Sequence, residues 1–138
     1  MEKNKVCLMV NGTNYDLSIG TNPGEVAPSD TLAKTLRETL LLTGTKISCD
    51  GGACGCCTVI MDGEAVLSCT LLTVECGGRS IRTIEGLQNP ETGELDKLQQ
   101  AFVDHSAFQC GYCVLVQREM EFCLLQISYF GACLSDIV

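Results

Sequence analysis

Positive charge is scarce in this sequence. Lysine and arginine together number 9 against 17 aspartate and glutamate residues, which gives a net charge of −8 among 138 residues. No basic run is present, and no aromatic residues are interleaved with basic ones. Proteins that bind nucleic acids usually carry a basic patch for the phosphate backbone. We therefore exclude nucleic acid as a partner.

Long apolar runs are also missing. No run approaches the roughly 18 apolar residues that indicate a membrane-spanning helix. The first apolar run, at residues 6–10, is too short for the hydrophobic region of a secretory signal peptide. We therefore expect a cytoplasmic protein with no membrane partner. Its cysteines should stay reduced and bind metal rather than form disulfide bonds.

The sequence offers little for catalysis. Its single histidine, His105, is expected on the surface of a helix rather than in a metal site. No Ser/His/Asp set, paired-carboxylate site or phosphate-binding loop is visible. This chain is therefore not expected to convert a substrate by itself.

Cysteine, by contrast, is abundant, with 11 residues. Three of them have the spacing C-x4-C-x2-C and one more follows, so that the set is Cys49, Cys54, Cys57 and Cys69. This is the spacing of a plant-type 2Fe-2S cluster, which takes three thiolates from one tight loop and one from a neighbouring element. Gly51, Gly52 and Gly55 allow positive φ and close backbone approach, so main-chain N–H groups can turn toward the sulfurs. We predict a one-electron carrier at these four cysteines.

Other cysteines give weaker signals. Cys56 adjoins Cys57, and neighbouring residues in a tight loop seldom point the same way, so we expect Cys56 to face the loop exterior or a partner. Four cysteines lack ligand spacing and are expected to be small buried hydrophobic residues, namely Cys7, Cys76, Cys123 and Cys133.

Cys110 and Cys113 form an isolated C-x2-C pair. Such a pair is compatible with half of a zinc site, half of an iron-sulfur site or a dithiol redox pair. A zinc ribbon that joined it to Cys54 and Cys57 would have 52 residues between the two pairs, against a usual spacing of roughly 15 to 20. It would also leave two of the four spaced cysteines unused.

Alternating apolar residues predict five strands, at residues 6–10, 15–17, 58–61, 65–67 and 81–84. Asn11-Gly12 stands between the first two strands and Asp62-Gly63 between the next two. Both dipeptides are preferred in the type I′ turns of β-hairpins. We therefore expect two hairpins and a fifth strand.

Three helices are predicted. The first starts at a cap in residues 29–31 and ends at Gly44, which is placed for a left-handed cap. The second begins at about residue 94, and the third at about residues 110–113.

The change from strand to helix periodicity places a domain boundary near residues 85–93. We therefore predict an α+β chain with one domain at residues 4–85 and a helical domain at residues 94–138.

Several ordered motifs carry a resemblance to a known family. They are Leu42-Thr43-Gly44-Thr45-Lys46, the cysteine run at residues 49–59, Ser68-Cys69, Thr83-Ile84-Glu85-Gly86-Leu87 and Gln109-Cys110-Gly111-Tyr112-Cys113. Over roughly residues 4–113 the chain closely resembles the iron-sulfur subunit of molybdenum hydroxylases, the xanthine dehydrogenase family. Relatives in that family include the small subunits of 4-hydroxybenzoyl-CoA reductase and carbon monoxide dehydrogenase.

The resemblance implies a fold and partners. The fold would be a β-grasp, plant-ferredoxin-like domain followed by a small α-helical bundle. The partners would be a large subunit that holds molybdopterin and a medium subunit that holds FAD. The four spaced cysteines would bind the cluster nearer the flavin.

The resemblance also assigns the second half of the chain. Cys110 and Cys113 would belong to a second 2Fe-2S cluster nearer the molybdenum, and Gln109 would hydrogen-bond the molybdopterin cofactor. Considered without the resemblance, Gln109 is a capping amide ahead of a helix.

The tail departs from the family pattern. Val114-Leu115-Val116 replaces the expected Thr-Pro-Gly, and no Cys-x-Cys pair follows to complete the second cluster. Cys123 and Cys133 are an alternative ligand pair, but they are ten residues apart. A truncated or frame-shifted end is the simpler hypothesis, with the helical domain truncated or aberrant after about residue 113 and the second cluster incomplete.

The leading prediction is an electron-transfer subunit of a molybdenum-flavin hydroxylase. It would pass electrons between the molybdopterin centre and FAD through 2Fe-2S clusters. Three alternatives stay open, namely a free-standing plant-type ferredoxin, a structural zinc-binding interaction module and a non-functional fragment. The sequence does not disclose the substrate of the complex.

Overall fold

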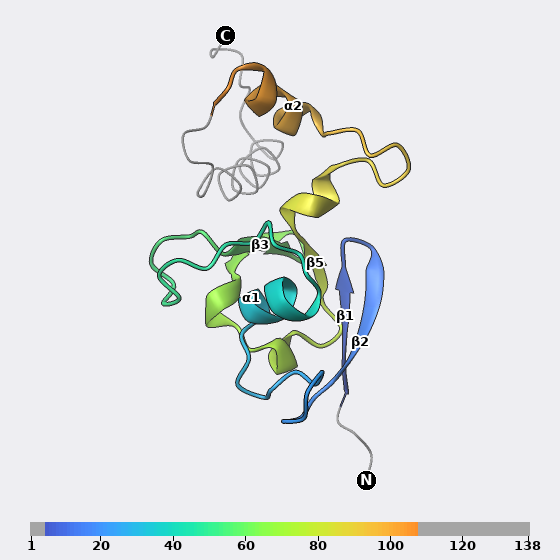
Figure 1. The fold of residues 1–138 in the computed structure, drawn as a ribbon, viewed down its shortest axis with the longest axis vertical. Helices are drawn as coiled ribbons and strands as arrows, with labels where there is room; N and C mark the ends of the chain where they lie inside the picture. The colour runs from blue at the N-terminus through green and yellow to red at the C-terminus, as the bar shows by residue number, and fades with distance from the viewer. Residues whose placement is uncertain (1–4, 108–138) are drawn as a thin grey trace.

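The main element of the fold is a five-stranded mixed sheet, seen in a computed structural model that describes residues 5–107 (Figure 1). The strands are β1 (Lys5–Val10), β2 (Thr13–Ser18), β3 (Thr58–Met61), β4 (Glu64–Leu67) and β5 (Ser80–Arg82). They lie in the order β2-β1-β5-β3-β4, with β1 and β5 parallel and the other neighbours antiparallel. Each one overlaps a strand that the sequence predicts.

Both predicted hairpin turns are present. Asn11 and Gly12 have φ values of 51° and 80°, and Asp62 and Gly63 have φ values of 53° and 90°. Two successive positive φ values are what a type I′ turn requires, and these residue types adopt them at low cost. The turns fix the antiparallel register of β1 with β2 and of β3 with β4.

The first helix ends earlier than predicted. It consists of α1 (Leu32–Lys34) and a wider π-helical turn, η1 (Thr35–Thr39). Leu41, with φ of 57°, takes the left-handed conformation after the last turn, so the prediction that Gly44 ends the helix is wrong. Gly44 is needed for close packing instead, because a Cβ there would lie 2.2 Å from Cγ2 of Ile84.

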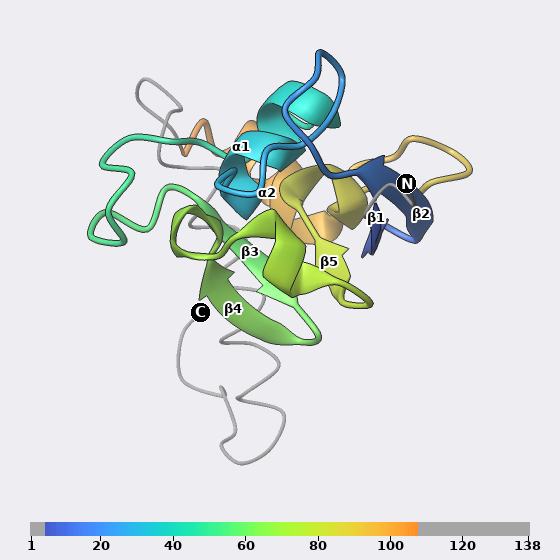
Figure 2. The same cartoon turned by 90° about the horizontal axis from the view of Figure 1, so that it is seen from below.

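The core lies between α1 and one face of the sheet (Figure 2). Every second residue of β1 is buried, which is the pattern of a strand with one face on a core. The buried residues of this core are Val6, Leu8, Val10, Leu32, Leu36, Val59, Cys76 and Ile81. Burial of this apolar surface stabilises the sheet from which the cysteine loop projects.

Two cysteines outside the predicted ligand set lie on opposite sides of β1. Cys76 is buried in the core, as predicted. Cys7 is exposed, and its Sγ donates a hydrogen bond to Oδ1 of Asp16 at 2.7 Å. The prediction that Cys7 is buried is wrong because odd-numbered residues of β1 face away from the core. Cys123 and Cys133 lie outside the described residues.

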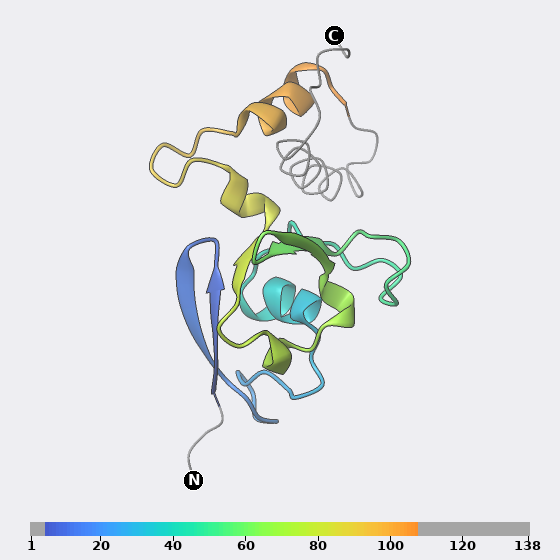
Figure 3. The same ribbon diagram turned by 180° about the vertical axis from the view of Figure 1, so that it is seen from behind.

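A second, smaller part follows β5. The chain passes through the 3-10 turn η4 (Ile84–Leu87) and a loop into α2 (Lys97–Asp104), which lies beyond that loop from the sheet (Figures 1 and 3). The side chain of Gln99 is buried, and its Nε2 donates to the carbonyl oxygen of Ile84 at 3.1 Å. This hydrogen bond ties α2 to the end of the first part.

Helix α2 confirms the helix predicted near residue 94, and His105 is exposed at its C-terminal cap, as predicted. The predicted third helix and the helical bundle extend beyond residue 107, outside the described residues. Within residues 5–107 we find no helix with the length and hydrophobicity to cross a bilayer.

Candidate metal centre

The cysteine loop runs from the end of the first helix to β3 and has no regular secondary structure. Positive φ values occur at Asp50 (49°), Gly52 (72°) and Gly55 (76°). Gly51 does not share them, so its predicted role in a left-handed conformation is wrong, and Asp50 takes that conformation instead. Gly52 is also close to another segment, since a Cβ there would lie 2.9 Å from Cγ2 of Thr70.

Main-chain N–H groups turn toward Cys49, as predicted. The N–H groups of Ala53 and Cys54 each donate to Sγ of Cys49 at 3.3 Å. Hydrogen bonds from the N–H groups of Gly51, Cys54 and Ala53 lower the pKa of the Cys49 thiol to about 6. A thiol that is ionised near neutral pH is suited to bind metal, because the thiolate is the form that coordinates.

Cys57 and Cys69 form the buried side of the site, with 3% and 7% of their surface exposed. Cys57 immediately precedes β3, and Cys69 lies in the 3-10 turn η2 (Ser68–Thr70) after β4. Ser68 joins these elements, because its Oγ donates to the carbonyl oxygen of Cys57 at 2.5 Å. Burial and a hydrogen bond with Cys57 raise the pKa of Cys69 above its usual range, against the opposing effect of the Gly52 N–H.

The four thiols lie in two neighbouring pairs. The thiol of Cys54 lowers the pKa of Cys49 and the thiol of Cys57 raises that of Cys69, so the two members of each pair are near one another. The charge of Cys49 also raises the pKa of Cys69, so the two pairs share one region. In the part of the chain that the structure describes, no three His, Cys, Asp or Glu side chains surround a single ion position. Two pairs fit a cluster in which four thiolates are divided between two irons.

The two pairs differ in access to solvent. Cys49 and Cys54 are exposed, whereas Cys57 and Cys69 are buried. A hollow of about 360 Å³ adjoins the exposed side, between the loop and the β3–β4 hairpin. Its lining includes Cys54 together with small and apolar residues such as Ala53, Ala65 and Leu67. A partner that approached this side would reach the site with the least displacement of the protein.

The prediction that Cys56 faces the loop exterior is wrong. Cys56 is 8% exposed, and its carbonyl oxygen accepts a hydrogen bond from the N–H of Lys46 at 3.1 Å. The loop is therefore already closing onto the body of the protein at this residue. Residues 56–60 are all buried, because Cys56 precedes a strand that is covered on both faces. A strand of this kind shows no alternation of buried and exposed residues, so its sequence carried no signal for the burial of Cys56.

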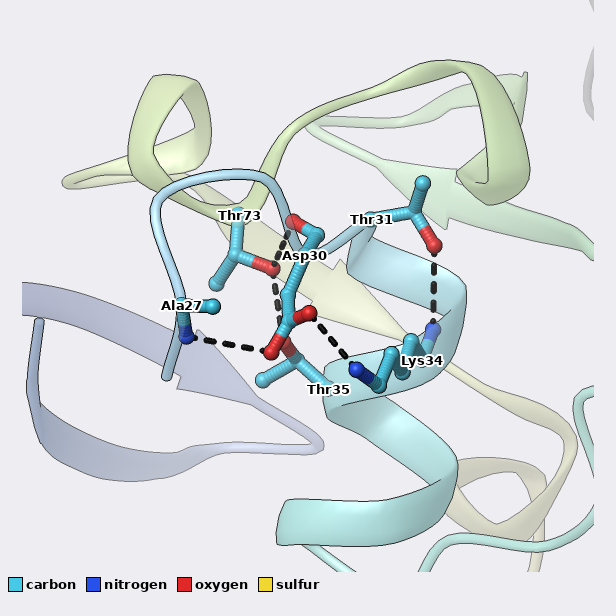
Figure 4. Close-up of polar contacts among 6 residues, drawn as sticks. All are labelled: Ala27, Asp30, Thr31, Lys34, Thr35 and Thr73. Carbon is cyan, nitrogen blue, oxygen red and sulfur yellow. Dashed lines mark hydrogen bonds and ion pairs between the residues drawn. The ribbon is translucent and has the colours of Figure 1, made fainter. Parts of the chain in front are cut away.

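The segment after Cys69 is held by the start of the first helix (Figure 4). The carbonyl oxygen of Asp30 accepts hydrogen bonds from the N–H and Oγ1 of Thr73, at 3.0 and 3.1 Å. The hydroxyls of Thr73 and Thr35 form a buried hydrogen bond at 2.7 Å. A hydrogen bond from Lys34 holds the pKa of the Asp30 carboxyl below its usual range. These contacts fix the position of Cys69 relative to the core.

Three predicted site residues lie outside the described residues. They are Gln109, Cys110 and Cys113.

The chain matches two families of iron-sulfur proteins. Residues 22–79 match the 2Fe-2S iron-sulfur cluster binding domain, and residues 83–116 match the [2Fe-2S] binding domain. A solved structure, quinoline 2-oxidoreductase from Pseudomonas putida 86, is similar with a TM-score of 0.78 and 37% sequence identity. That likeness covers 91% of this chain and 72% of the other. The chain belongs to the iron-sulfur subunits of the molybdenum hydroxylase family.

Three further relatives of this iron-sulfur subunit illustrate the family. The small subunit of nicotine 6-hydroxylase from Paenarthrobacter nicotinovorans is 51% identical over 84 residues, which cover 61% of this chain and 49% of that one. The aldehyde oxidoreductase iron-sulfur-binding subunit of Escherichia coli K12 is 45% identical over 106 residues, which cover 77% of this chain and 42% of that one. For a probable xanthine dehydrogenase subunit of Bacillus subtilis the identity is 38%, and the coverage is 82% of this chain and 60% of the relative.

This iron-sulfur subunit spans from 42% to 60% of the length of these three relatives. All three are named as subunits, and none is named as a free-standing ferredoxin or a zinc protein. The comparisons therefore do not favour the ferredoxin or the zinc module as alternatives.

Proposed function

We propose that this chain transfers electrons within a molybdenum-flavin hydroxylase, between the molybdopterin centre and FAD on partner subunits. The four cysteines of residues 49–69 would hold the 2Fe-2S cluster that carries them. The observation on which this proposal chiefly depends is the grouping of their thiols in two adjacent pairs, with three thiols from the glycine-containing loop and one from η2.

The residues fit such a cluster in number and chemistry. Four thiols supply the four ligands, and main-chain N–H groups point at Cys49, where they offset negative charge. When bound, a 2Fe-2S cluster accepts and releases one electron, at about −400 mV for the plant type. The chain's own contribution is to fix the thiolates, to donate N–H hydrogen bonds and to exclude water from one side.

The unequal exposure of the two pairs supports a direction for partner contact. Cys49 and Cys54 lie on the exposed side, next to the hollow lined by Ala53, Ala65 and Leu67. We assign this side to the flavin-carrying subunit. Cys57 and Cys69 are enclosed by the protein, which keeps that half of the site dry.

The proposal includes partners. The relatives are named as small or iron-sulfur-binding subunits, which supports a complex for this chain as well. Its large subunit would hold molybdopterin and its medium subunit would hold FAD, in the cytoplasm. The substrate would be bound by the large subunit.

The proposal extends to the fold and the second half of the chain. The strand order β2-β1-β5-β3-β4 with a helix on one face supports a β-grasp domain at residues 4–85. The family match at residues 83–116 supports a second cluster-binding domain from residue 94 onward. In this domain Cys110 and Cys113 would bind a second 2Fe-2S cluster, and Gln109 would contact molybdopterin.

Anaerobic reconstitution of the full chain with iron and sulfide tests the cluster. We expect the EPR signal of a reduced 2Fe-2S centre, and two iron atoms per chain for one cluster or four for two. Serine substitution of Cys49 or Cys69 should abolish the signal of the first cluster, whereas Cys76→Ser should leave it. A full chain that binds zinc without iron or acid-labile sulfide would contradict the proposal.

Purification of the tagged chain from its source cells tests the complex. We expect polypeptides that carry FAD and molybdenum to co-purify in fixed proportion. A chain that takes up the cluster but purifies alone would support a free-standing ferredoxin instead.

A further inference from the structure

The entrance of the cysteine loop, which we define as residues 43–48, has no regular secondary structure. It is nevertheless held on one side by Glu85, 41 residues away from Gly44 along the chain. Oε1 of Glu85 accepts a hydrogen bond from the N–H of Gly44 at 2.7 Å, and its Oε2 accepts one from Oγ1 of Thr83 at 2.6 Å. A carboxylate that accepts a main-chain N–H makes a stronger hydrogen bond than a neutral acceptor.

Glu85 is itself fixed by its neighbours. Asn11, in the first hairpin turn, accepts a hydrogen bond from the N–H of Thr83 at 2.8 Å and donates one to Oγ1 of Thr83 at 2.9 Å. The approach is close on both sides, because a Cβ on Gly86 would lie 2.2 Å from Oδ1 of Asn11 and a Cβ on Gly44 would lie 2.7 Å from Oε1 of Glu85. Residues 83–86 are therefore packed closely against the first hairpin turn and the loop entrance, and both oxygens of the carboxylate accept a hydrogen bond.

The other side of the entrance is held by cations. Nη1 of Arg37 donates to the carbonyl oxygens of Thr43 and Thr45, at 2.8 and 2.5 Å. Nζ of Lys46 also donates to the carbonyl oxygen of Thr43, at 2.7 Å. The backbone of the entrance is thus clamped between Arg37 and Glu85, through its carbonyl groups on one side and an N–H group on the other.

The clamp reaches the ligands through two short connections. The N–H of Lys46 donates to the carbonyl oxygen of Cys56, next to Cys57. The side chain of Ile47 packs on the small buried cluster that contains Cys57 and Cys69. A shift of Gly44 would therefore be passed to both halves of the ligand set, because the entrance also leads directly into Cys49.

We propose that Glu85 is a positioning residue for the cluster, which fixes the entrance of the cysteine loop through the N–H of Gly44. This inference rests on the proposed function and extends it, since Glu85 carries no cysteine spacing and lies outside the loop. Without Glu85 the entrance loses its hydrogen bond from the side of η4, and the thiolates lose part of their preset geometry. Groups that orient metal ligands typically change metal affinity about 10- to 100-fold when they are removed.

The test uses the full chain after anaerobic reconstitution. We expect Glu85→Ala to lose its 2Fe-2S absorbance to an iron chelator about tenfold faster than the wild type, as typical for removal of an orienting group. Its reduced-state EPR g values should also shift. Glu85→Gln keeps an acceptor oxygen for Gly44 and should stay near the wild type in both measurements. Gly44→Ala places a Cβ against both Ile84 and Glu85, so it should push the entrance away from η4 and resemble Glu85→Ala.

Asp62→Ala is the matched control. Asp62 also accepts one main-chain N–H, from Ser80 at 2.9 Å, and one side-chain hydrogen bond, from Arg79 at 2.9 Å, but at the far hairpin turn. We expect this variant to lose thermal stability but to keep the EPR g values of the wild type. Its rate of cluster loss should rise no more than its loss of thermal stability explains.

Two results would overturn the inference. One is a Glu85→Ala chain with the g values of the wild type, in which the rate of cluster loss rises only as much as the loss of thermal stability explains, as expected for Asp62→Ala. The other, available if Glu85→Ala does not fold, is wild-type behaviour of Gly44→Ala. Failure of the wild-type chain itself to take up a 2Fe-2S cluster would instead refute the proposed function, and this inference with it.

Discussion

Cys49 and Cys69 are both proposed ligands, but their surroundings act on their thiols in opposite directions. Three main-chain N–H groups lower the pKa of exposed Cys49 to about 6. Burial and the neighbouring Cys57 thiol raise the pKa of Cys69 above its usual range. At the scale of single residues the site therefore combines one thiol that is ready to bind metal at neutral pH with one that metal must deprotonate. Metal binding at such a site releases protons.

This difference predicts the order of alkylation in the cluster-free chain. The thiolate is the reacting form, so the rate at Cys49 should rise with pH through a midpoint near 6 and be close to its maximum at pH 7. Cys69 should stay largely unreacted at that pH. Mass spectrometry of peptides after timed treatment with iodoacetamide measures both rates. Equal rates at pH 7 would contradict the expectation.

Gly52 provides a second prediction at the residue scale. Gly52→Ala places a Cβ where φ is 72° and where Thr70 lies 2.9 Å away, so the loop must shift. We expect a loss of unfolding free energy of about 1 to 3 kcal/mol and poor cluster uptake. Gly63→Ala is the control, because its φ is 90° but nothing lies within 4 Å of the added Cβ. This control should share the backbone strain but keep normal cluster uptake, as measured by iron per chain.

At the scale of elements, the end of the first helix carries an avoidable strain. Leu41 has φ of 57°, a conformation that glycine adopts freely and leucine does not, and its side chain is 74% exposed. The wider π-helical turn η1 places Leu41, rather than Gly44, at this point. The element is therefore set by packing of its leucines on the core rather than by the best local cap.

Leu41→Gly should accordingly stabilise the chain. The expected gain is about 1 kcal/mol in the free energy of unfolding, because relief of the left-handed strain, about 1 to 3 kcal/mol, outweighs the entropy that glycine adds to the unfolded chain, about 0.5 to 1 kcal/mol. Leu41→Ala keeps the unfavourable φ and should give no such gain. Urea unfolding of the three proteins measures the difference. A Leu41→Gly chain that is less stable than Leu41→Ala would show that the left-handed backbone at residue 41 is not a source of strain.

At the scale of the whole molecule, η4 joins three regions. Asn11 of the first hairpin and Gly44 of the loop entrance both contact the chain at residues 83–85. Gln99 of α2 contacts the carbonyl oxygen of Ile84 between them. The second part of the chain is thereby attached at the same place that clamps the cysteine loop.

Gln99 predicts how firmly α2 is attached. Gln99→Ala removes the donor to the carbonyl oxygen of Ile84 and the acceptor for the N–H of Asp96. We therefore expect faster hydrogen exchange in α2 and a loss of about 1 to 3 kcal/mol in the free energy of unfolding. Gln100→Ala is the control, because Gln100 is exposed and its side chain bonds Asp104 within the same helix. Mass-spectrometric hydrogen exchange measures both. Equal exchange in the two variants would mean that the contact does not hold α2.

Much of the fold could be predicted because its signals are local. Asn11-Gly12 and Asp62-Gly63 place two hairpins, since these residue types favour the positive φ values that a two-residue hairpin turn needs. Two of the wrong predictions concern positions where contacts distant in sequence decide. Cys56 is buried by the closing of the loop onto the body of the protein, and Gly44 is reserved for contact with Ile84 rather than for a helix cap.

By itself, the sequence determined which four cysteines are the proposed ligands, because one loop must present three thiols at fixed intervals and only this stretch does so. Only the tertiary structure decided how those thiols pair, which pair faces solvent and what holds the loop in place. The physical reason is how far apart in the sequence the deciding residues lie. Ligand spacing is a property of a few consecutive residues, whereas burial and the hydrogen bond from Gly44 to Glu85 exist only once separate segments have packed together.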